Sequence, residues 1–242
     1  MPNTKEVNSL NKTLEELVLI SGLSGYETNV KNYLFKKLKN KSLKSTSDVL
    51  GNLICTIKGD ESLPSIILFA HMDQLGFVVK KIEDDGFIRV ERVGGIPEKA
   101  LASQDIVIVN NKNELVKGII ANKSHHATQP DEKYTVTTIK NLYIDAGFKN
   151  KKDVLKNGIN IGSPVTYAPY YKTLSNNNVC GSSIDDRAGC AVILSVAGSL
   201  FQLKKKPTVH IVFSVQEEFN LRGVLPVINI LKPDIAIQVD LT

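Results

Sequence analysis

The sequence predicts an α/β fold, in which a domain with a parallel sheet is interrupted by a small β-rich, barrel-like domain. Short apolar runs typical of strands buried on both faces occur at 64–70 and again after residue 180, where they alternate with segments of helical spacing. This strand, helix, strand rhythm is typical of a parallel sheet with crossover helices. From about residue 76 to 170 the pattern changes to alternating runs with short turns, which predicts a separate β module.

The first seventy residues predict two helices, a hairpin and a buried strand. The stretch "LNKTLEELVLIS" has apolar residues at helical spacing, and Ser24 with Glu27 has the pattern of a capping box that opens a second helix. Gly51-Asn52 separates two alternating runs in "TSDVLGNLICTIKG", which predicts a hairpin. The continuous apolar run "PSIILFA" predicts a strand buried on both faces.

The middle third predicts two more hairpins, and the last third returns to alternating helices and strands. One hairpin is centred on Asp85-Gly86 in "FVVKKIEDDGFIRVERVGG", and the other on the polar turn of "DIVIVNNKNELVKGII". After residue 180 we expect helices at 185–201 and 222–231, the second despite Pro226, and buried strands at 208–215 and 234–239.

Composition and charge exclude several classes of protein. The formal net charge of +5 comes mainly from lysine runs without interleaved arginine and aromatic residues, so we expect solvated faces and no nucleic-acid partner. The longest largely apolar stretch, 188–201, is shorter than the roughly 18 residues that a membrane span needs, and the start has no signal-peptide pattern. We therefore expect no membrane partner. Cys55, Cys180 and Cys190 show no CxxC spacing, which favours reduced thiols in a cytoplasmic protein.

Histidine and acidic residues follow each predicted buried strand or begin the helix between strands. They are His71 and Asp73, the pair Asp185 and Asp186, Glu217 and Glu218, and Asp240. Because ligands of parallel α/β sheets bind beyond the carboxyl ends of the strands, we expect these side chains to converge. One imidazole and several carboxylates in one place need cations to neutralise them, and zinc, cobalt and manganese favour these ligands. A carboxylate can also bridge two metals that activate a shared water.

Each pattern has a plainer interpretation when it is taken alone. A single His-x-Asp is more often a surface or core-edge pair, and paired acids often begin helices and complement the helix dipole. In a metal site, Asp73 can instead accept the second imidazole N–H of His71. The adjacent acids of "QEE" need not share a role, since one can bind metal while the other acts as a general base. The order and placement of all four patterns favour the metal site.

The sequence resembles the M42 metallo-aminopeptidases, the group of glutamyl and tetrahedral aminopeptidases. The resemblance runs through "GNLI", "AHMDQLGF", "KSHH", "LYIDAG", "SSIDDRAG", "VQEEFNLRG" and "IQVD". It implies a dinuclear-metallopeptidase domain formed by residues 1–74 and 166–242, and an inserted β-rich domain at 75–165 that serves oligomerisation. It also implies a hydrolase that removes single residues from the free N-termini of peptide substrates, as a cytoplasmic homo-oligomer in which dimers commonly assemble into dodecamers.

The resemblance further implies a role for each candidate residue. The metal ligands that it implies are His71, Asp185, Glu218 and Asp240. Asp185 is the bridging carboxylate, Glu218 binds the second metal, and the other two bind the first. Asp73 orients His71 and Glu217 is the general base, so that both belong to the catalytic group. The implied cofactors are two divalent ions, zinc or cobalt, with manganese as a further candidate.

The sequence departs from the family pattern at its end. The family continues beyond the position of Thr242 and supplies a further histidine ligand there, whereas no histidine follows His210 here. The second metal then keeps only Asp185 and Glu218. We therefore expect this chain alone to hold at most one metal tightly and to be poorly active or inactive, whether it is a fragment, one half of a split gene or a degenerate paralogue.

Two alternatives stay open from the sequence. One is a non-catalytic assembly or regulatory subunit of the same fold, although retention of Asp73, Glu217 and Glu218 favours catalysis. The other is the M20 group of dinuclear amidohydrolases and carboxypeptidases, which carries its extra domain after the glutamate pair. Here the interval between His71 and Asp185 holds the β module, which favours M42.

For three further residues in or near these patterns we expect roles other than binding metal or substrate. We expect a structural or subunit-contact role for His125 and His126, which lie in the inserted module. For Arg187, which directly follows the two aspartates, we expect an ion pair behind the metal ligands.

Overall fold

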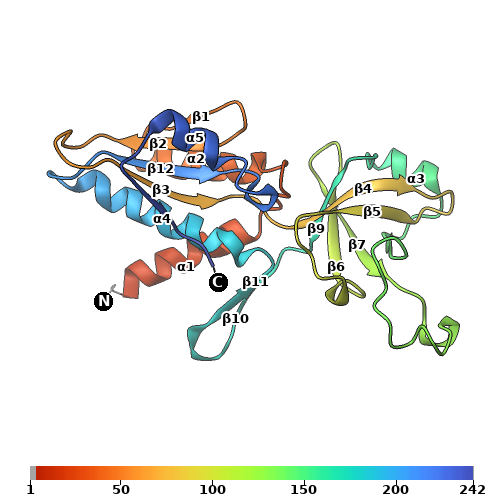
Figure 1. Cartoon of the computed structure of the whole chain (residues 1–242). Coiled ribbons are helices and arrows are strands. Elements are labelled where there is room, and N and C mark those ends of the chain that lie inside the picture. Colours follow the sequence, from red (N-terminus) through yellow and green to blue (C-terminus); the bar gives the residue numbers. More distant parts are fainter. Residues whose placement is uncertain (1–3, 242) are drawn as a thin grey trace. The chain divides into compact units, whose positions relative to one another are not determined.

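The computed structural model describes residues 4–241 (Figure 1). The chain forms two compact units, one from residues 1–74 with 170–242 and the other from residues 75–169. None of the described helices is both long and apolar enough to cross a membrane. Cys55, Cys180 and Cys190 are free thiols.

Within residues 4–241, the first unit contains a five-stranded sheet, four α-helices and a separate two-stranded ribbon. The helices are α1 (Thr4–Val18), α2 (Thr28–Asn40), α4 (Ile184–Gln202) and α5 (Val224–Leu231). The strands of the sheet are β1 (Thr46–Ser47), β2 (Leu53–Ile57), β3 (Ile66–His71), β12 (Val209–Ser214) and β13 (Ile235–Gln238), and the ribbon is β10 (Tyr171–Thr173) with β11 (Val179–Gly181).

The sheet is mixed, with strand order β1-β2-β12-β3-β13. Its three strands β12, β3 and β13 are parallel, as the strand, helix, strand rhythm predicts. In contrast, β2 runs antiparallel to β12 and forms the predicted hairpin with β1. The connection from β2 to β3, residues 58–65, is shorter than the dozen or so residues that a parallel crossover needs, so the two strands run in opposite directions. The expectation of a parallel sheet therefore holds for β12, β3 and the edge strand β13 only.

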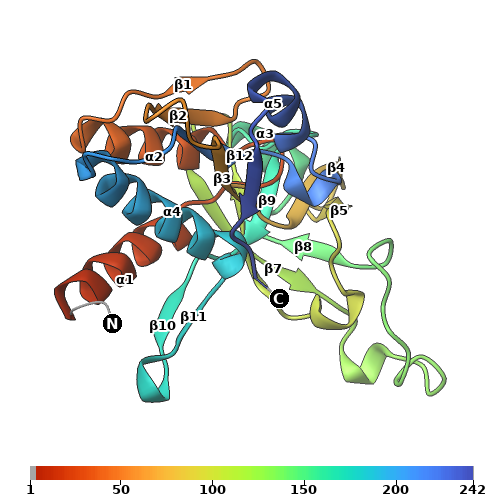
Figure 2. The same ribbon diagram turned by 60° about the vertical axis from the view of Figure 1, so that its left-hand side comes forward.

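Both faces of the sheet are covered, which explains the continuous apolar run in β3. Side chains of α1, α2 and α4 pack with β2, β3 and β12 into one core cluster. On the opposite face, Ile67 and Phe69 of β3 pack with Val224 and Val227 of α5. Figure 2 shows α1 and α4 together on one side of the sheet and α5 on the other. A strand between two apolar layers has no polar face, so β3 carries its first polar side chain where it ends, at His71.

The start of α2 differs from the sequence prediction. The helix begins at Thr28, and the side chain of Glu27 makes no capping hydrogen bond. The Glu27 carboxylate accepts the N–H groups of Gly25 and Gln216, at 2.7 and 3.1 Å. The capping-box prediction for Ser24 and Glu27 is therefore wrong, because a distant main-chain donor takes the carboxylate.

The second unit is a closed antiparallel barrel with one short α-helix, α3 (Lys151–Lys156), and two 3-10 turns, Glu98–Ala100 and His125–Ala127. Its strands are β4 (Gly76–Ile82), β5 (Ile88–Val93), β6 (Asp105–Val109), β7 (Leu115–Ala121), β8 (Tyr143–Asp145) and β9 (Pro164–Tyr167). The two predicted hairpins are confirmed as β4–β5 and β6–β7. Gly86 in the first turn has φ +91°, and a Cβ there would lie 2.7 Å from the carbonyl oxygen of Phe148, so the turn requires glycine.

Candidate metal centre

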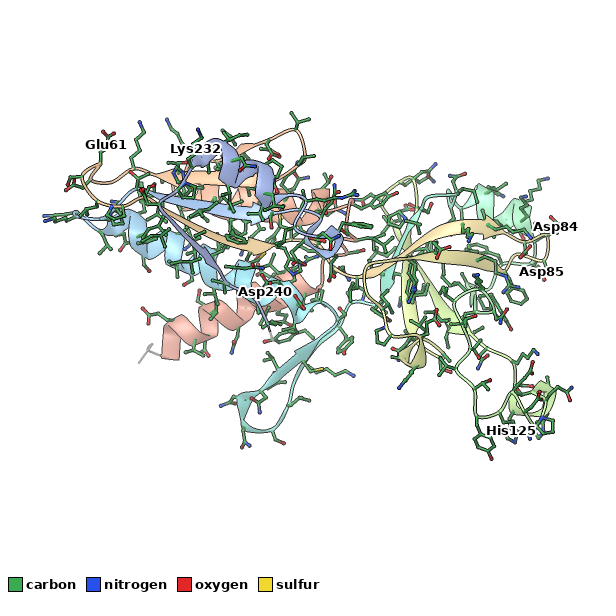
Figure 3. All side chains as sticks on the ribbon, in the orientation of Figure 1. Glu61, Asp84, Asp85, His125, Lys232 and Asp240 are labelled. Carbon is green, nitrogen blue, oxygen red and sulfur yellow. The ribbon has the colours of Figure 1, made fainter. Side chains whose placement is uncertain are left out.

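The candidate site begins at the carboxyl end of β3, where His71 is the last residue of the strand and is buried. Its Nε2 lies 3.0 Å from Asp185, 3.8 Å from Glu217 and 4.0 Å from Asp240. Asp240 follows β13, the neighbouring strand (Figure 3). One ligand atom from each of His71, Asp185 and Asp240 lies within 4.8 Å of the others. The structure thus brings these three predicted ligands together, with Glu217 beside them.

Asp73 fixes both the imidazole and the chain that carries the two glutamates. Nδ1 of His71 lies 3.2 Å from the main-chain oxygen of Asp73 and 3.4 Å from its carboxylate. The same buried carboxylate accepts the main-chain N–H groups of Glu217 and Glu218, at 3.0 and 3.2 Å. Burial would raise the pKa of Asp73, but the bonds from His71 and Glu217 outweigh it and lower the pKa. Asp73 therefore remains a carboxylate that orients the ring.

Asp185 and Asp186 lie at the start of α4 and have different surroundings. Neither has helical backbone angles, and the peptide bond between them is cis. Asp185 is exposed and reaches His71, whereas Asp186 is fully buried. The Asp186 carboxylate accepts the main-chain N–H groups of His71 and Gly189, at 3.2 and 2.8 Å. The two adjacent acids therefore differ in what they bind. Asp185 is available to a ligand, whereas Asp186 holds the main chain at the end of β3.

Glu217 and Glu218 begin a short 3-10 turn, Glu217–Phe219, after β12. Glu218 is not one of the three residues that offer ligand atoms within 4.8 Å of one another. Burial, followed by the charges of Asp73 and Glu217, raises the pKa of Glu218 to about 7 against the opposing effect of His71. Burial also raises the pKa of Glu217. Both glutamates therefore lie near the candidate site in surroundings that disfavour negative charge.

The electrostatics of the cluster fit a divalent cation. Burial alone would lower the pKa of His71, but Asp73, Asp186 and Glu217 raise it to about 9. Burial raises the pKa of Asp186 to about 7 against the effect of His71. Without a cation, the negative charge of the cluster is thus partly neutralised by a proton on His71 and by partial protonation of Asp186. An imidazole with several carboxylate oxygens is also a donor set that zinc, cobalt and manganese accept.

Arg187 is fully buried, and its hydrogen bonds go to neutral acceptors rather than to a carboxylate. Its guanidinium donates to the carbonyl oxygens of Leu17 and Ile20, at 3.1 and 3.3 Å, and to the side-chain oxygen of Gln74, at 3.4 Å. The side chain therefore ties the end of α1 to the chain that leaves β3. The expected ion pair behind the metal ligands is replaced by these bonds to oxygen atoms that carry no charge.

His125 and His126 lie in the barrel unit, within the 3-10 turn His125–Ala127 (Figure 3). Both are exposed, and their rings are 5.9 Å apart in an edge-to-face arrangement. Neither histidine belongs to the group of three candidate ligands found among the described residues.

The fold and the cluster define a class, the α/β proteins with a candidate divalent-metal site at the carboxyl ends of sheet strands. Within it the chain belongs to the M42 glutamyl aminopeptidase family, because residues 51–242 match the sequence model of that family. The M20 alternative is therefore not supported.

Relatives and solved structures agree with this assignment. The chain is 37% identical to the putative aminopeptidase SgcX of Escherichia coli over 235 residues, which are 97% of this chain and 63% of that protein. An aminopeptidase of the archaeon Desulfurococcus kamchatkensis superposes with a TM-score of 0.89 at 32% identity, over 97% of this chain and 63% of the other. The TET1 peptidase of Pyrococcus horikoshii, which can assemble into a tetrahedron or a large octahedral shell, gives 0.88 at 26% identity, over 96% and 68%. The chain thus spans about 63% of the length of SgcX.

Proposed function

We propose that this chain acts in a metal-dependent aminopeptidase that removes single residues from the free N-termini of peptides. The observation that carries the proposal is the convergence of His71, Asp185 and Asp240 within 4.8 Å, with a carboxylate oxygen of Glu217 3.8 Å from the imidazole. Relatives named aminopeptidases, among them the lysyl aminopeptidase of Pyrococcus furiosus, support the reaction class.

The residues of the cluster would divide the chemistry among them. His71, Asp185 and Asp240 would hold a divalent ion, and Glu218 would bind a second one. When bound, such an ion supplies a Lewis acid that polarises the substrate carbonyl and lowers the pKa of a water. Glu217, whose pKa is raised by burial, accepts the proton of the attacking water and returns it to the leaving amine. Asp73 holds both His71 and the main chain of Glu217 in place.

The metal content follows from the ligands that are present. A first ion would have His71, Asp185 and Asp240. A second ion would share Asp185 and gain Glu218, which are the ligands that the family resemblance assigns to it in this chain. We propose zinc or cobalt, with manganese as a further candidate, and one tightly held ion per 242-residue chain. We further propose a cytoplasmic homo-oligomer, since structural neighbours include a dodecameric peptidase from the same group.

Hydrolysis of aminoacyl p-nitroanilides tests the proposed reaction. The full assembly in which this chain acts is loaded with cobalt or zinc and compared with the same assembly carrying Glu217→Gln, which removes the base but keeps the size of the side chain. We expect turnover that depends on the metal and falls at least about 100-fold in the variant, because a positioned general base contributes 10²–10⁴-fold. Metal binding without turnover by the full assembly would favour the non-catalytic subunit instead. Turnover that is unaffected by chelators would contradict both the metal-dependent aminopeptidase and the non-catalytic subunit.

A further inference from the structure

The segment from Val215 to Gly223, here called the glutamate loop, connects β12 to α5 and carries Glu217 and Glu218. Apart from the short 3-10 turn it has no regular structure. Three of its residues other than glycine, Gln216, Asn220 and Leu221, have left-handed backbone angles, with φ of 52°, 60° and 57°. Left-handed angles are unfavourable for residues with a side chain. The conformation of the loop therefore has to be imposed by the groups around it.

Side chains from three distant segments bind the start of the glutamate loop. Four consecutive main-chain N–H groups, those of residues 215–218, each donate to a side-chain oxygen. The acceptors are Asn52 for the first, Glu27 for the second and Asp73 for the third and fourth. Because the N–H groups of the two glutamates are fixed in this way, the directions of their side chains depend on the same bonds.

Asn52 differs from the other two acceptors because it also binds the far end of the loop. Its Oδ1 accepts the N–H of Val215 at 2.9 Å, and its Nδ2 donates to the carbonyl oxygen of Gly223, also at 2.9 Å. The two ends of the loop approach so closely that a Cβ on Gly223 would lie 2.1 Å from the carbonyl oxygen of Val215. One amide group thus closes the glutamate loop from both sides.

Asp48 sets the orientation of the Asn52 amide. Its carboxylate accepts Nδ2 of Asn52 at 2.6 Å and the main-chain N–H groups of Gly51 and Asn52, both at 2.9 Å. A flipped amide would turn its oxygen toward two acceptors and its nitrogen toward the N–H of Val215. Only one orientation satisfies all the partners, and Asn52 is fully buried, so no solvent competes for them.

We propose that Asn52 is a positioning residue, which holds Glu217 and Glu218 in place for catalysis by closing the glutamate loop. The inference rests on the proposed function, because it concerns the same two glutamates. Asn52 carries no charge and its side chain bonds to Asp48, Gly223 and Val215, so its replacement by an uncharged residue leaves the charge of the site unchanged. Any effect of the replacement on metal binding or turnover then arises through the position of the loop.

The test compares Asn52→Leu with Asn110→Leu as a matched control. Asn110 is a buried amide of the barrel unit, which accepts the N–H groups of Lys112 and Glu114 and donates to the carbonyl oxygen of Asn157. Both variants lose a buried amide that joins two chain segments. Only Asn52 joins the ends of the glutamate loop. Asp48→Asn serves as a milder second variant, because it leaves Asn52 in place and removes the carboxylate that orients its amide.

The first measurement is hydrogen exchange of the metal-free protein, resolved over the glutamate loop and over β12. We expect Asn52→Leu to speed exchange of the amides of residues 215–218 at least about tenfold, while β12 keeps its protection and Asn110→Leu leaves the loop unchanged. Asp48→Asn is expected to act in the same direction with a smaller effect. Exchange in the loop that does not change, or that rises equally in β12, would overturn the proposal.

The second measurement is the affinity for a second Co²⁺ ion, the one that Glu218 would bind, with Glu218→Gln as a reference. We expect Asn52→Leu to weaken Co²⁺ binding roughly tenfold, at the lower end of the loss that follows removal of groups that orient metal ligands, and Asn110→Leu to leave it unchanged. A loss of affinity in Glu218→Gln but not in Asn52→Leu would overturn the positioning role. If the unaltered chain binds no Co²⁺, the proposed metal site fails, and the exchange measurement still decides on Asn52.

Discussion

Replacing Arg187 with methionine tests how far this single side chain stabilises the first unit. The guanidinium is fully buried and gives hydrogen bonds to the carbonyl oxygens of Leu17 and Ile20 and to the side chain of Gln74. Burial lowers the pKa of Arg187 to about 10, so the side chain remains charged at neutral pH. Methionine fills a similar volume but donates no hydrogen bond.

The expected loss of stability follows from the acceptors that remain. Three oxygen atoms lose their charged donor, and a hydrogen bond that involves a charged group contributes about 1.5–3 kcal/mol. The oxygen of Leu17 keeps the N–H of Ile20, and that of Gln74 keeps the N–H of Gly22. The buried carboxylates of Glu27, Asp73 and Asp186 also lose the positive charge that acts on them. Partial relaxation and entry of water reduce the sum, so we expect the free energy of unfolding to fall by about 3–5 kcal/mol, as for the removal of one partner from a buried ionic network.

Urea unfolding followed by circular dichroism measures this loss, and Arg89→Met in the barrel unit is the matched control. Arg89 also donates to main-chain oxygens and pairs with Glu83, but 35% of its side chain is exposed, so we expect a loss of about 1 kcal/mol or less. A loss below about 1 kcal/mol for Arg187→Met would show that the buried hydrogen bonds of Arg187 do not stabilise the unit.

Three other predictions concern the candidate site and the core. In Asp240→Asn one carboxylate of the cluster is neutralised, and we expect Zn²⁺ affinity measured by calorimetry to fall more than about 100-fold, since a lost ligand costs more than a lost orienting group. Because the carboxylates raise the pKa of His71 to about 9 in the metal-free chain, a proton must leave before the metal binds, so we expect affinity to rise with pH from 7 and to level off above about 9. Ile67→Ala empties a buried position between the sheet and α5, and we expect urea unfolding to show a loss of about 2–5 kcal/mol.

Each of these predictions has an outcome that contradicts it. Unchanged Zn²⁺ affinity in Asp240→Asn would remove this residue from the site. Metal affinity that does not vary with pH would show that His71 is not a ligand. For the core, Leu115→Ala is the control, because Leu115 is 48% exposed and we expect a change within about 0.5 kcal/mol. Equal losses in the two alanine variants would contradict the packing of Ile67 against α5.

Local patterns predicted the elements of the fold better than their orientation. The turn at Asp85-Gly86 carries its own signal, because the backbone there requires glycine, and the hairpin was predicted correctly. Likewise, Pro226 lies in the first turn of α5, where a missing N–H costs little, so the predicted helix forms. The direction of β2 was not predicted, since it depends on the length of the connection to β3. The capping-box prediction failed because Gln216, far away in the sequence, supplies a competing donor.

At the candidate site, too, local sequence patterns predicted some residues, whereas residues that act on distant segments were missed. The rule that ligands gather at strand ends predicted that His71, Asp185 and Asp240 converge, and the structure places them together. Glu27 and Asn52 received no role at the site from the sequence, and Asp186 was expected in the cluster without a role of its own, because each acts on a main-chain N–H of another segment. Nothing in their neighbouring residues signals such a partner. Only the arrangement of the segments in space reveals it.

X-ray absorption at the zinc edge tests directly whether His71, Asp185 and Asp240 form a metal centre. The metal-free chain is loaded with one equivalent of Zn²⁺ and compared with His71→Ala. We expect a first shell of one imidazole nitrogen with carboxylate or water oxygens, at the distances of about 2.0–2.2 Å usual for these ligands, and loss of the imidazole signal in the variant. A shell that contains sulfur, or an imidazole signal that persists in His71→Ala, would contradict a metal centre built on His71, Asp185 and Asp240.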